Sequence, residues 1–165
     1  MYKSIYLAQR NPALTSEQFH ERWKAHSALT GTTQHIRPYF TQVDQCARFD
    51  GVGPEDASQA FDGANLLGLV ERAGGYGVFD KPERRDIMLP DELLTFSGPI
   101  RDCSLVTREH VCKSGRFSRY LILRFMNFAR PAEPEELFSR WCDQQTARDC
   151  KGTRRRWYPV QSRTS

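Results

Sequence analysis

One histidine in the middle of an apolar helix face is the residue in this sequence best suited to chemistry. It is His26, in the segment LTSEQFHERWKAHSAL, and at about 100° per residue it shares a face with Phe19, Trp23 and Thr30. An imidazole has an ordinary pKa of about 6.5, so it can accept or release a proton near neutral pH. The sequence leaves two interpretations open: a proton carrier at the edge of a pocket, or a polar residue packed for structural reasons.

The helix that carries His26 has clear local signals. Thr15 is a natural N-cap, and Gln18 stands three residues later, which is the spacing of a capping box. Pro12 keeps the helix from starting earlier, and Gly31 can end it. We therefore predict a helix from about Thr15 to Gly31.

Strand-like segments surround this helix. Alternating or apolar runs bounded by turn residues predict strands. The candidates, in chain order, are YKSIYLAQR (2–10), HIRPYFTQV (35–43, broken by Pro38), FDGANLLGLVE (61–71) and RDCSLVTREHV (101–111). The segment PERRDIMLPDELLTF (82–96) is predicted to be helical in pieces, interrupted at Pro90. The order is β-α-β-β-α-β, so we predict an α+β fold of the ferredoxin-like pattern.

The last third of the chain partly repeats the first. RYLILRFMNF (119–128) resembles the first strand, and the pairs Arg22-Trp23 and Arg140-Trp141 differ by 118 positions. We predict a ferredoxin-like domain at 1–115 and an incomplete second copy at 116–165 that packs on it, with RRWYPVQS (155–162) as its second strand. At the same offset His26 corresponds to Gln144, so this position does not require an imidazole. That difference favours a local task for His26, and a partly exposed polar position in both copies is the alternative.

The segment RNPALTSEQFHERWKAH, with a tyrosine-containing strand before it and Phe61-Asp62-Gly63 after it, resembles the EthD-like branch of the dimeric α+β barrel proteins. The resemblance covers residues 2 to about 110. It implies that two ferredoxin-like sheets pair face to face around a small barrel, either between chains or between repeats. It also implies the activities of that group, which are those of cofactor-free isomerases, cyclases, dehydratases and monooxygenases acting on small aromatic or lactone substrates.

Within this resemblance, His26 follows Phe19 by seven residues, which is the spacing of the catalytic histidine in the methylmuconolactone methylisomerases. Tyr39 matches a pocket tyrosine of the same group. Typical EthD-like sequences place the histidine four residues after the tryptophan, and here it follows Trp23 by three. After the Asp-Gly pair the third strand has Asn65 in a region where relatives carry a glutamate or a nucleophilic cysteine. A cysteine-assisted mechanism is therefore not expected.

The barrel implied by the resemblance suggests further pocket residues. We predict that Ile5 and Leu7 meet the helices and that Tyr6, on the opposite strand face, lines the barrel. Arg124 lies 118 positions after Tyr6 and can pair with a carboxylate or an enolate. The alternative is that Tyr6 and Tyr39 are half-buried strand aromatics and that Arg124 is a surface residue.

The predicted site therefore has His26 and Tyr39 as its catalytic residues. The residues predicted to bind the substrate are Tyr6, Trp23, His35 and Arg124. The predicted function is a cofactor-independent isomerase, lyase or monooxygenase that acts on a small aromatic or lactone molecule by histidine acid–base chemistry. The alternative is a non-catalytic small-ligand binding or accessory protein of the same fold, and in either case we expect a homodimer.

Other functional classes find little support in the 165 residues. The five cysteines form no CxxC pair and no HxxxH or HExxH occurs, so we expect no metal. The glycines form neither GxGxxG nor a P-loop, so we expect no nucleotide cofactor. The cluster KGTRRRWYP (151–159) is basic and aromatic, but a net charge of +4 is too small for a dedicated nucleic-acid protein. No apolar run approaches a membrane span or a signal peptide, and we expect a cytoplasmic protein.

Overall fold

The structure is a computed structural model, and it describes residues 1–51, 55, 57–113, 120–125, 136, 139–140 and 155–157. The described residues fall into two compact units, one up to Thr107 and one from Arg108 onward. The first unit holds the sheet, the helices and the residues that bear on function.

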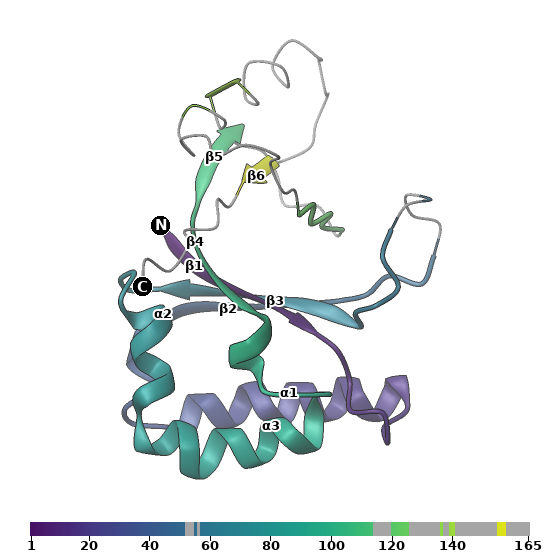
Figure 1. The fold of residues 1–165 in the computed structure, drawn as a ribbon, viewed down its shortest axis with the longest axis vertical. Helices are drawn as coiled ribbons and strands as arrows, with labels where there is room; N and C mark the ends of the chain where they lie inside the picture. Colours follow the sequence, from purple (N-terminus) through teal and green to yellow (C-terminus); the bar gives the residue numbers. More distant parts are fainter. Residues whose placement is uncertain are drawn as a thin grey trace. The chain divides into compact units, whose positions relative to one another are not determined.

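The first unit is a four-stranded sheet with helices on one face (Figure 1). Its strands are β1 (Tyr2–Ala8), β2 (Phe40–Ala47), β3 (Gly63–Leu69) and β4 (Ser104–Arg108). They are arranged in the order β2-β3-β1-β4, and β3 is antiparallel to both of its neighbours. The helices are α1 (Ser16–Thr32), α2 (Gly74–Gly77) and α3 (Leu89–Thr95). This order of elements and strands is that of the ferredoxin-like fold, which confirms the predicted fold class.

Helix α1 forms where its local signals predict it. The Thr15 hydroxyl accepts a hydrogen bond from the Gln18 amide at 3.2 Å, and the Gln18 side chain accepts one from the Thr15 amide at 2.9 Å, so the capping box is complete. The helix ends at Thr32, one residue later than Gly31 alone would indicate, and the Thr33 amide still bonds to the Thr30 carbonyl. The buried residues of α1 are Phe19, Trp23 and His26, as its periodicity predicts.

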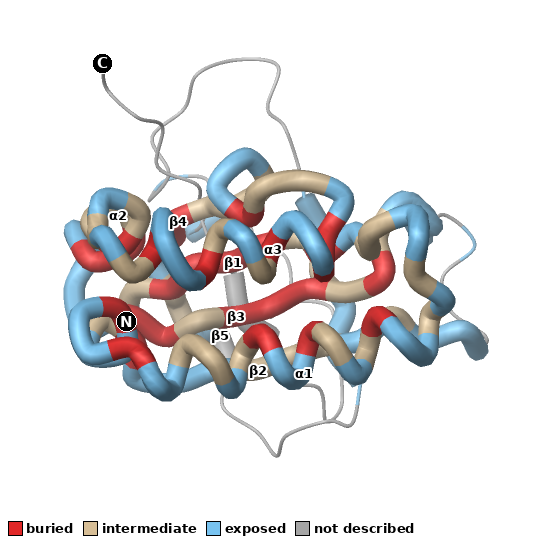
Figure 2. The backbone as a smooth tube through the Cα atoms, turned by 90° about the horizontal axis from the view of Figure 1, so that it is seen from below, coloured by how far each residue is buried: buried red, intermediate tan, exposed pale blue. Residues whose placement is uncertain are grey.

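Tyr6 faces the helices, and the opposite prediction is wrong. The register pairs Tyr6 with Asn65 and Ile5 with Leu66, so Tyr6 and Asn65 share one sheet face. Tyr6 packs there in a cluster with Phe19, Trp23 and Phe96. The physical reason is the indole N–H of Trp23, which needs an acceptor inside the core and finds it in the Tyr6 hydroxyl at 2.9 Å. Figure 2 shows that β1 and β3, which carry this face, are buried along most of their length.

Two prolines act differently from their predicted roles. Pro38 does not interrupt a strand, because it sits in a 3₁₀ turn (Arg37–Tyr39) and β2 begins after it at Phe40. Pro90 does not interrupt the second helical segment either, because the helical backbone continues through Leu89 into α3, with Pro90 in the first turn of that helix. The segment just before it, Arg84–Met88, has the wider turns of a π-helix, which leave room for the proline ring.

The second unit contains an antiparallel pair of strands, β5 (His110–Lys113) and β6 (Arg155–Trp157). Residues 120–125 are in neither helix nor strand, so over these positions the strand predicted at 119–128 does not form. The remaining residues of that segment, together with Trp141 and Gln144, lie outside the described residues. The prediction of an incomplete second repeat at 116–165 therefore stays a prediction.

Gly63 gives the first testable prediction. A Cβ atom at this position would lie 2.6 Å from the Cys46 carbonyl oxygen and 2.8 Å from the Trp23 ring, and neither the backbone nor a buried ring can move away cheaply. We expect Gly63→Ala to lower the free energy of unfolding by about 1–3 kcal/mol, the usual cost of overpacking. Urea denaturation measures the change. Gly31→Ala is the matched control, since nothing lies within 4 Å of its Cβ position and alanine is the better helix former, and equal midpoints for the two variants would contradict the close packing at Gly63.

Candidate functional site

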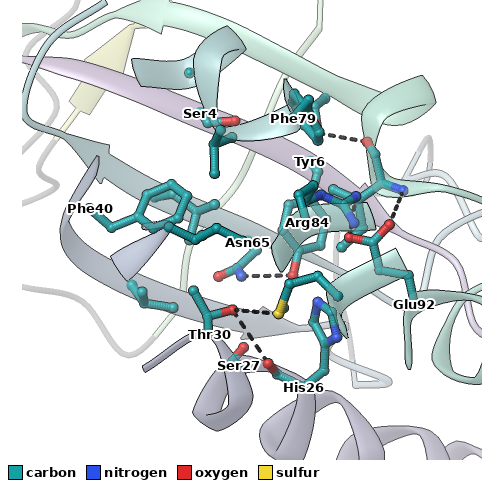
Figure 3. Close-up of a pocket in the computed structure, with 18 residues that line it drawn as sticks. Ser4, Tyr6, His26, Ser27, Thr30, Phe40, Asn65, Phe79, Arg84 and Glu92 are labelled. Carbon is teal, nitrogen blue, oxygen red and sulfur yellow. Dashed lines mark hydrogen bonds and ion pairs between the residues drawn. The ribbon is translucent and has the colours of Figure 1, made fainter. Parts of the chain in front are cut away.

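A cavity of about 60 Å³ lies between the helix-covered face of the sheet and the helices (Figure 3). Strands β1 and β3 supply one wall, α1 supplies a second, and the segment from α2 to α3 supplies a third. Most of the lining is apolar. The polar and ionisable side chains that the site depends on are Tyr6, His26, Thr30, Asn65, Arg84 and Glu92.

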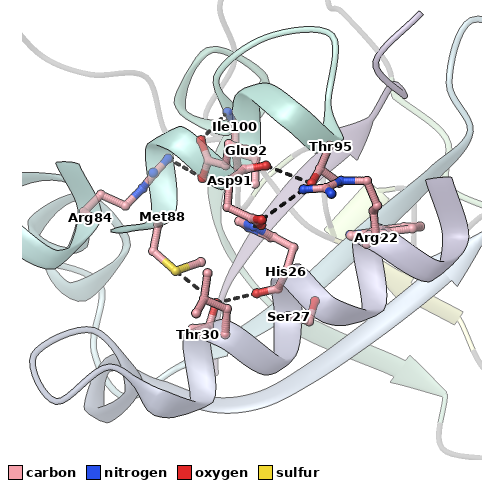
Figure 4. Close-up of polar contacts among 12 residues, drawn as sticks. Arg22, His26, Ser27, Thr30, Arg84, Met88, Asp91, Glu92, Thr95 and Ile100 are labelled. Carbon is pink, nitrogen blue, oxygen red and sulfur yellow. Dashed lines mark hydrogen bonds and ion pairs between the residues drawn. The ribbon is translucent and has the colours of Figure 1, made fainter. Parts of the chain in front are cut away.

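His26 is held in one orientation by a carboxylate. Its ring is 4% exposed, its Nδ1 lies 2.7 Å from Oδ2 of Asp91, and its ring meets the Phe96 ring edge to face at 5.3 Å (Figure 4). The other Asp91 oxygen accepts a hydrogen bond from Arg22 at 3.1 Å, which fixes the carboxylate in turn. Because a carboxylate accepts, Nδ1 carries the hydrogen and Nε2 keeps a free lone pair in the neutral imidazole.

Burial lowers the pKa of His26 from its ordinary value, while the hydrogen bond and the charge of Asp91 act in the opposite direction. The imidazole is therefore neutral at neutral pH and is able to act as a base. This is the protonation state that general base catalysis requires.

The titration of His26 gives a second prediction. With a lowered pKa in the folded chain, the unfolded chain binds more protons below about 6.5, so the stability that His26 contributes is complete above that pH and is lost as the pH falls. Asp91→Asn should lower the pKa further, because it removes the charge that raises it. An NMR titration of the His26 ring protons measures both midpoints, and a wild-type midpoint at or above 6.5 would contradict the burial argument.

Tyr6 is the centre of a buried hydrogen-bond group. Its hydroxyl oxygen accepts from the Trp23 indole at 2.9 Å and from the Asn65 side-chain amide at 2.8 Å. Burial raises the pKa of Tyr6 well above its ordinary value, because a phenolate would be desolvated there. Tyr6 therefore stays protonated, and the packed ring of Trp23 holds it in place.

Arg84 and Glu92 form a buried ion pair in the cavity wall supplied by the segment from α2 to α3. They are 7% and 2% exposed, and the guanidinium also lies over the Phe79 ring at 5.2 Å. The second oxygen of Glu92 accepts a hydrogen bond from the Ile100 amide at 3.2 Å. Burial raises the pKa of Glu92, and the charge of Arg84 opposes that rise. The positive charge of Arg84 and the negative charge of Glu92 therefore offset each other in the cavity wall.

A second cavity of about 160 Å³ lies on another side of Tyr6. Phe61, Phe96 and Pro99 are among its lining residues, and Cys103 lines it too. Burial raises the pKa of the Cys103 thiol, so it is not an activated nucleophile. This volume is similar to that of an apolar cavity that admits benzene. Tyr6 thus lines both the smaller cavity at His26 and the larger one.

The structure brings only some of the predicted site residues together. His26 and Tyr6 line the same cavity, and Trp23 stands behind Tyr6 as its hydrogen-bond donor. Tyr39 is not part of this lining, because its ring packs beside Gly74 with the Lys81 ammonium 5.4 Å from its centroid. The predicted pairing of Tyr39 with His26 in one pocket is therefore absent from the described structure.

The other two predicted substrate contacts are His35 and Arg124. His35 is exposed, and its Nδ1 lies 3.3 Å from Glu83, outside the cavity lining. Arg124 is exposed and belongs to the second unit, and its predicted contact with the substrate stays a prediction.

Sequence reasoning missed the residues that complete the site. Asp91 and Glu92 stand next to each other at the start of α3, where acidic residues are common for helix-dipole reasons alone. The partner of His26 is 65 positions away in the chain, and no local pattern predicts that contact. Asn65 stood out in the sequence only as a departure from the EthD-like resemblance, and this was the one usable signal.

Among the described residues no group of three or more histidine, cysteine, aspartate or glutamate side chains is placed to hold a metal ion. In the same part of the chain, every helix is too short or too polar to cross a bilayer.

No family model and no curated protein matches this chain. Among solved structures, it is similar to a dimeric ferredoxin-like protein of unknown function from Thermobifida fusca YX. The identity is 18%, the TM-score is 0.39, and the match covers 64% of this chain and 85% of that chain. The ferredoxin-like fold of this protein is accordingly assigned from its own strand order and connections.

Proposed function

We propose that this protein is a cofactor-independent acid–base enzyme, an isomerase or lyase that moves a proton on a small carbonyl compound. One observation carries the proposal: a neutral, buried histidine, oriented by Asp91 at 2.7 Å, lines a cavity together with the protonated Tyr6 hydroxyl. A base and a hydrogen-bond donor in one small cavity are the two groups that enolisation needs.

The geometry supports a simple sequence of proton transfers. Nε2 of His26 takes a proton from the carbon next to the carbonyl, and the electron pair moves onto the carbonyl oxygen, which the Tyr6 O–H stabilises. Asp91 stabilises the imidazolium that forms, because it already accepts from Nδ1. Returning the proton to a different atom completes an isomerisation, and loss of a neighbouring leaving group completes an elimination.

The volume of the cavity bears on the substrate. The EthD-like resemblance implies an aromatic or lactone molecule, and these two classes remain part of the proposal. An apolar cavity that admits benzene has about 150 Å³, whereas the cavity at His26 has about 60 Å³. The reacting group in this cavity is therefore smaller than an aromatic ring.

A non-catalytic binding protein is the second candidate function. It is favoured by Asn65, which stands on β3 where the EthD-like relatives carry an ionisable or nucleophilic group. A binding protein needs the cavity and its hydrogen-bonding groups but does not need the basic lone pair of His26.

Hydrogen exchange in heavy water separates the two candidates. Hydroxyacetone, γ-butyrolactone and cyclopentanone are incubated with the purified chain in D2O, and loss of the proton signals next to the carbonyl is followed by NMR. We expect the chain to accelerate this exchange for at least one compound. Binding without exchange would favour the binding-protein function. The absence of both binding and exchange would count against both candidate functions.

A homodimer is proposed together with this function, because the EthD-like resemblance implies that two sheets pair face to face. Light scattering at micromolar concentration measures the mass directly. The chain is 19.1 kDa, and a mass equal to that value would contradict the dimer.

A further inference from the structure

The hydrogen of the Tyr6 hydroxyl is free for a ligand. A hydroxyl oxygen has two lone pairs, and in Tyr6 both are occupied, one by the Trp23 indole at 2.9 Å and one by the Asn65 amide at 2.8 Å. The O–H hydrogen therefore points away from both donors, and no acceptor for it occurs among the described residues. Tyr6 is 3% exposed and lines the cavity of His26, so its O–H is a hydrogen-bond donor available to a ligand in that cavity.

Asn65 offers the complementary group. Its side chain is 2% exposed and lines the same cavity, and its Oδ1 has no hydrogen-bond partner among the described residues. A buried acceptor without a partner costs about 1–3 kcal/mol, so natural proteins rarely leave one without a ligand or a water. Because Nδ2 of the same amide bonds to the Tyr6 oxygen, the free acceptor and the free donor are neighbours (Figure 3).

We infer that the ligand of this cavity is a neutral molecule with a carbonyl beside an N–H or O–H group, and that Tyr6 and Asn65 bind these two groups together. The Tyr6 O–H donates to the carbonyl oxygen, and Asn65 Oδ1 accepts from the neighbouring donor. This inference rests on the proposed function and names its substrate class: small amides, lactams and α-hydroxycarbonyl compounds. Simple lactones lack the donor and would leave Oδ1 unpaired.

The charges around the cavity favour a neutral ligand over an anion. The charge of Arg84 is matched by Glu92, and its guanidinium is also covered by Phe79. One nitrogen of Arg84, Nη1, has no hydrogen-bond partner among the described residues and remains as a further donor to a carbonyl oxygen. An anion in this position would face the unpaired Oδ1 of Asn65 and the carboxylate of Glu92, and both would repel it.

Three ligands of equal size test the inference. Acetamide carries the donor and the acceptor, acetone carries the acceptor alone, and acetate carries a negative charge. Each is titrated into the full ¹⁵N-labelled chain, and the backbone amide signals of the residues that line the cavity are followed by NMR, so that wild type and variants have the same readout. We expect acetamide to bind about tenfold or more tightly than either analogue, because only acetamide satisfies the buried oxygen.

Variants assign the preference to its residues. In Asn65→Leu the advantage of acetamide over acetone should disappear, and Ser27→Ala, at another position in the same lining, should keep it. His26→Gln should also keep the preference for acetamide over acetone. The ligand preference therefore tests the substrate class separately from the acid–base function. The ratio of the wild-type affinities for acetamide and acetone tests the inference even if Asn65→Leu does not fold.

Two results would overturn the inference. Equal affinity for acetone and acetamide would show that Oδ1 is not used. Tightest binding of acetate would mean that Arg84 defines the site, or that the Asn65 amide turns its NH2 group to the cavity.

Discussion

Arg84→Met will lower the free energy of unfolding by about 3–5 kcal/mol, the usual cost of breaking a buried ion pair. The substitution leaves Glu92, which is 2% exposed, as a buried carboxylate without a counter-charge. Burial already raises the pKa of Glu92, and loss of Arg84 raises it further. The folded variant therefore binds more protons than its unfolded chain above about pH 4.3, so its deficit is largest at neutral pH and shrinks as the pH falls towards 4.3. Urea denaturation at several pH values measures this.

A neighbouring pair supplies the matched control. Arg85 bonds to Asp86 at 2.6 Å, but their side chains are 74% and 56% exposed, so Arg85→Met should change stability much less than Arg84→Met does. The double variant Arg84→Met, Glu92→Leu should recover most of the loss, because no charge remains buried. Equal costs for the Arg84 and Arg85 variants would show that the buried pair contributes no more than the exposed one.

His26→Gln will slow the proton exchange of an accepted substrate by about 10²–10⁴-fold, the usual contribution of a general base. Glutamine keeps a polar side chain of similar reach on α1 but has no basic nitrogen, so ligand affinity should change much less than the rate. The measurement is the deuterium exchange rate next to the carbonyl, followed by NMR at saturating substrate. The wild-type rate should fall as the pH drops through the lowered pKa of His26, since the protonated ring is not a base.

Two further variants separate a catalytic histidine from a structural one. His20→Gln changes a histidine of the same helix that does not line the cavity, and it should leave the rate unchanged. Asp91→Asn should slow exchange less than His26→Gln does, because it removes the orienting partner and leaves the base. An unchanged rate in His26→Gln would end the acid–base proposal and support the binding-protein function.

Features defined over a few neighbouring residues were predictable from the sequence. The capping box of Thr15 and Gln18 specifies where α1 begins, and both hydrogen bonds are present. The apolar spacing of Phe19 and Trp23 specifies which face of that helix is buried, and His26 is buried with them. The alternation of the strand segments, with the two helical segments between them, was enough to predict the ferredoxin-like order.

Where the sequence prediction failed, a long-range contact outweighed a local pattern. Alternation places Tyr6 and Ile5 on opposite faces of β1 but does not say which face meets the helices, and the need of the Trp23 N–H for an acceptor decides it. The predicted role of Tyr39 came from the EthD-like resemblance, yet the 3₁₀ turn around Pro38 and the packing beside Gly74 place its ring outside the cavity lining.

The sequence by itself determined the main elements of the first unit, their order and the position of His26 on the apolar face of α1. Tertiary structure alone decided which groups surround that histidine, because its partner Asp91 lies 65 positions away and Asn65 meets Tyr6 across 59. Caps and periodicity act over one or two helical turns, so they can be read from neighbouring residues. A hydrogen bond between distant segments depends on how sheet and helices pack, and a buried polar group then takes whichever partner that packing supplies.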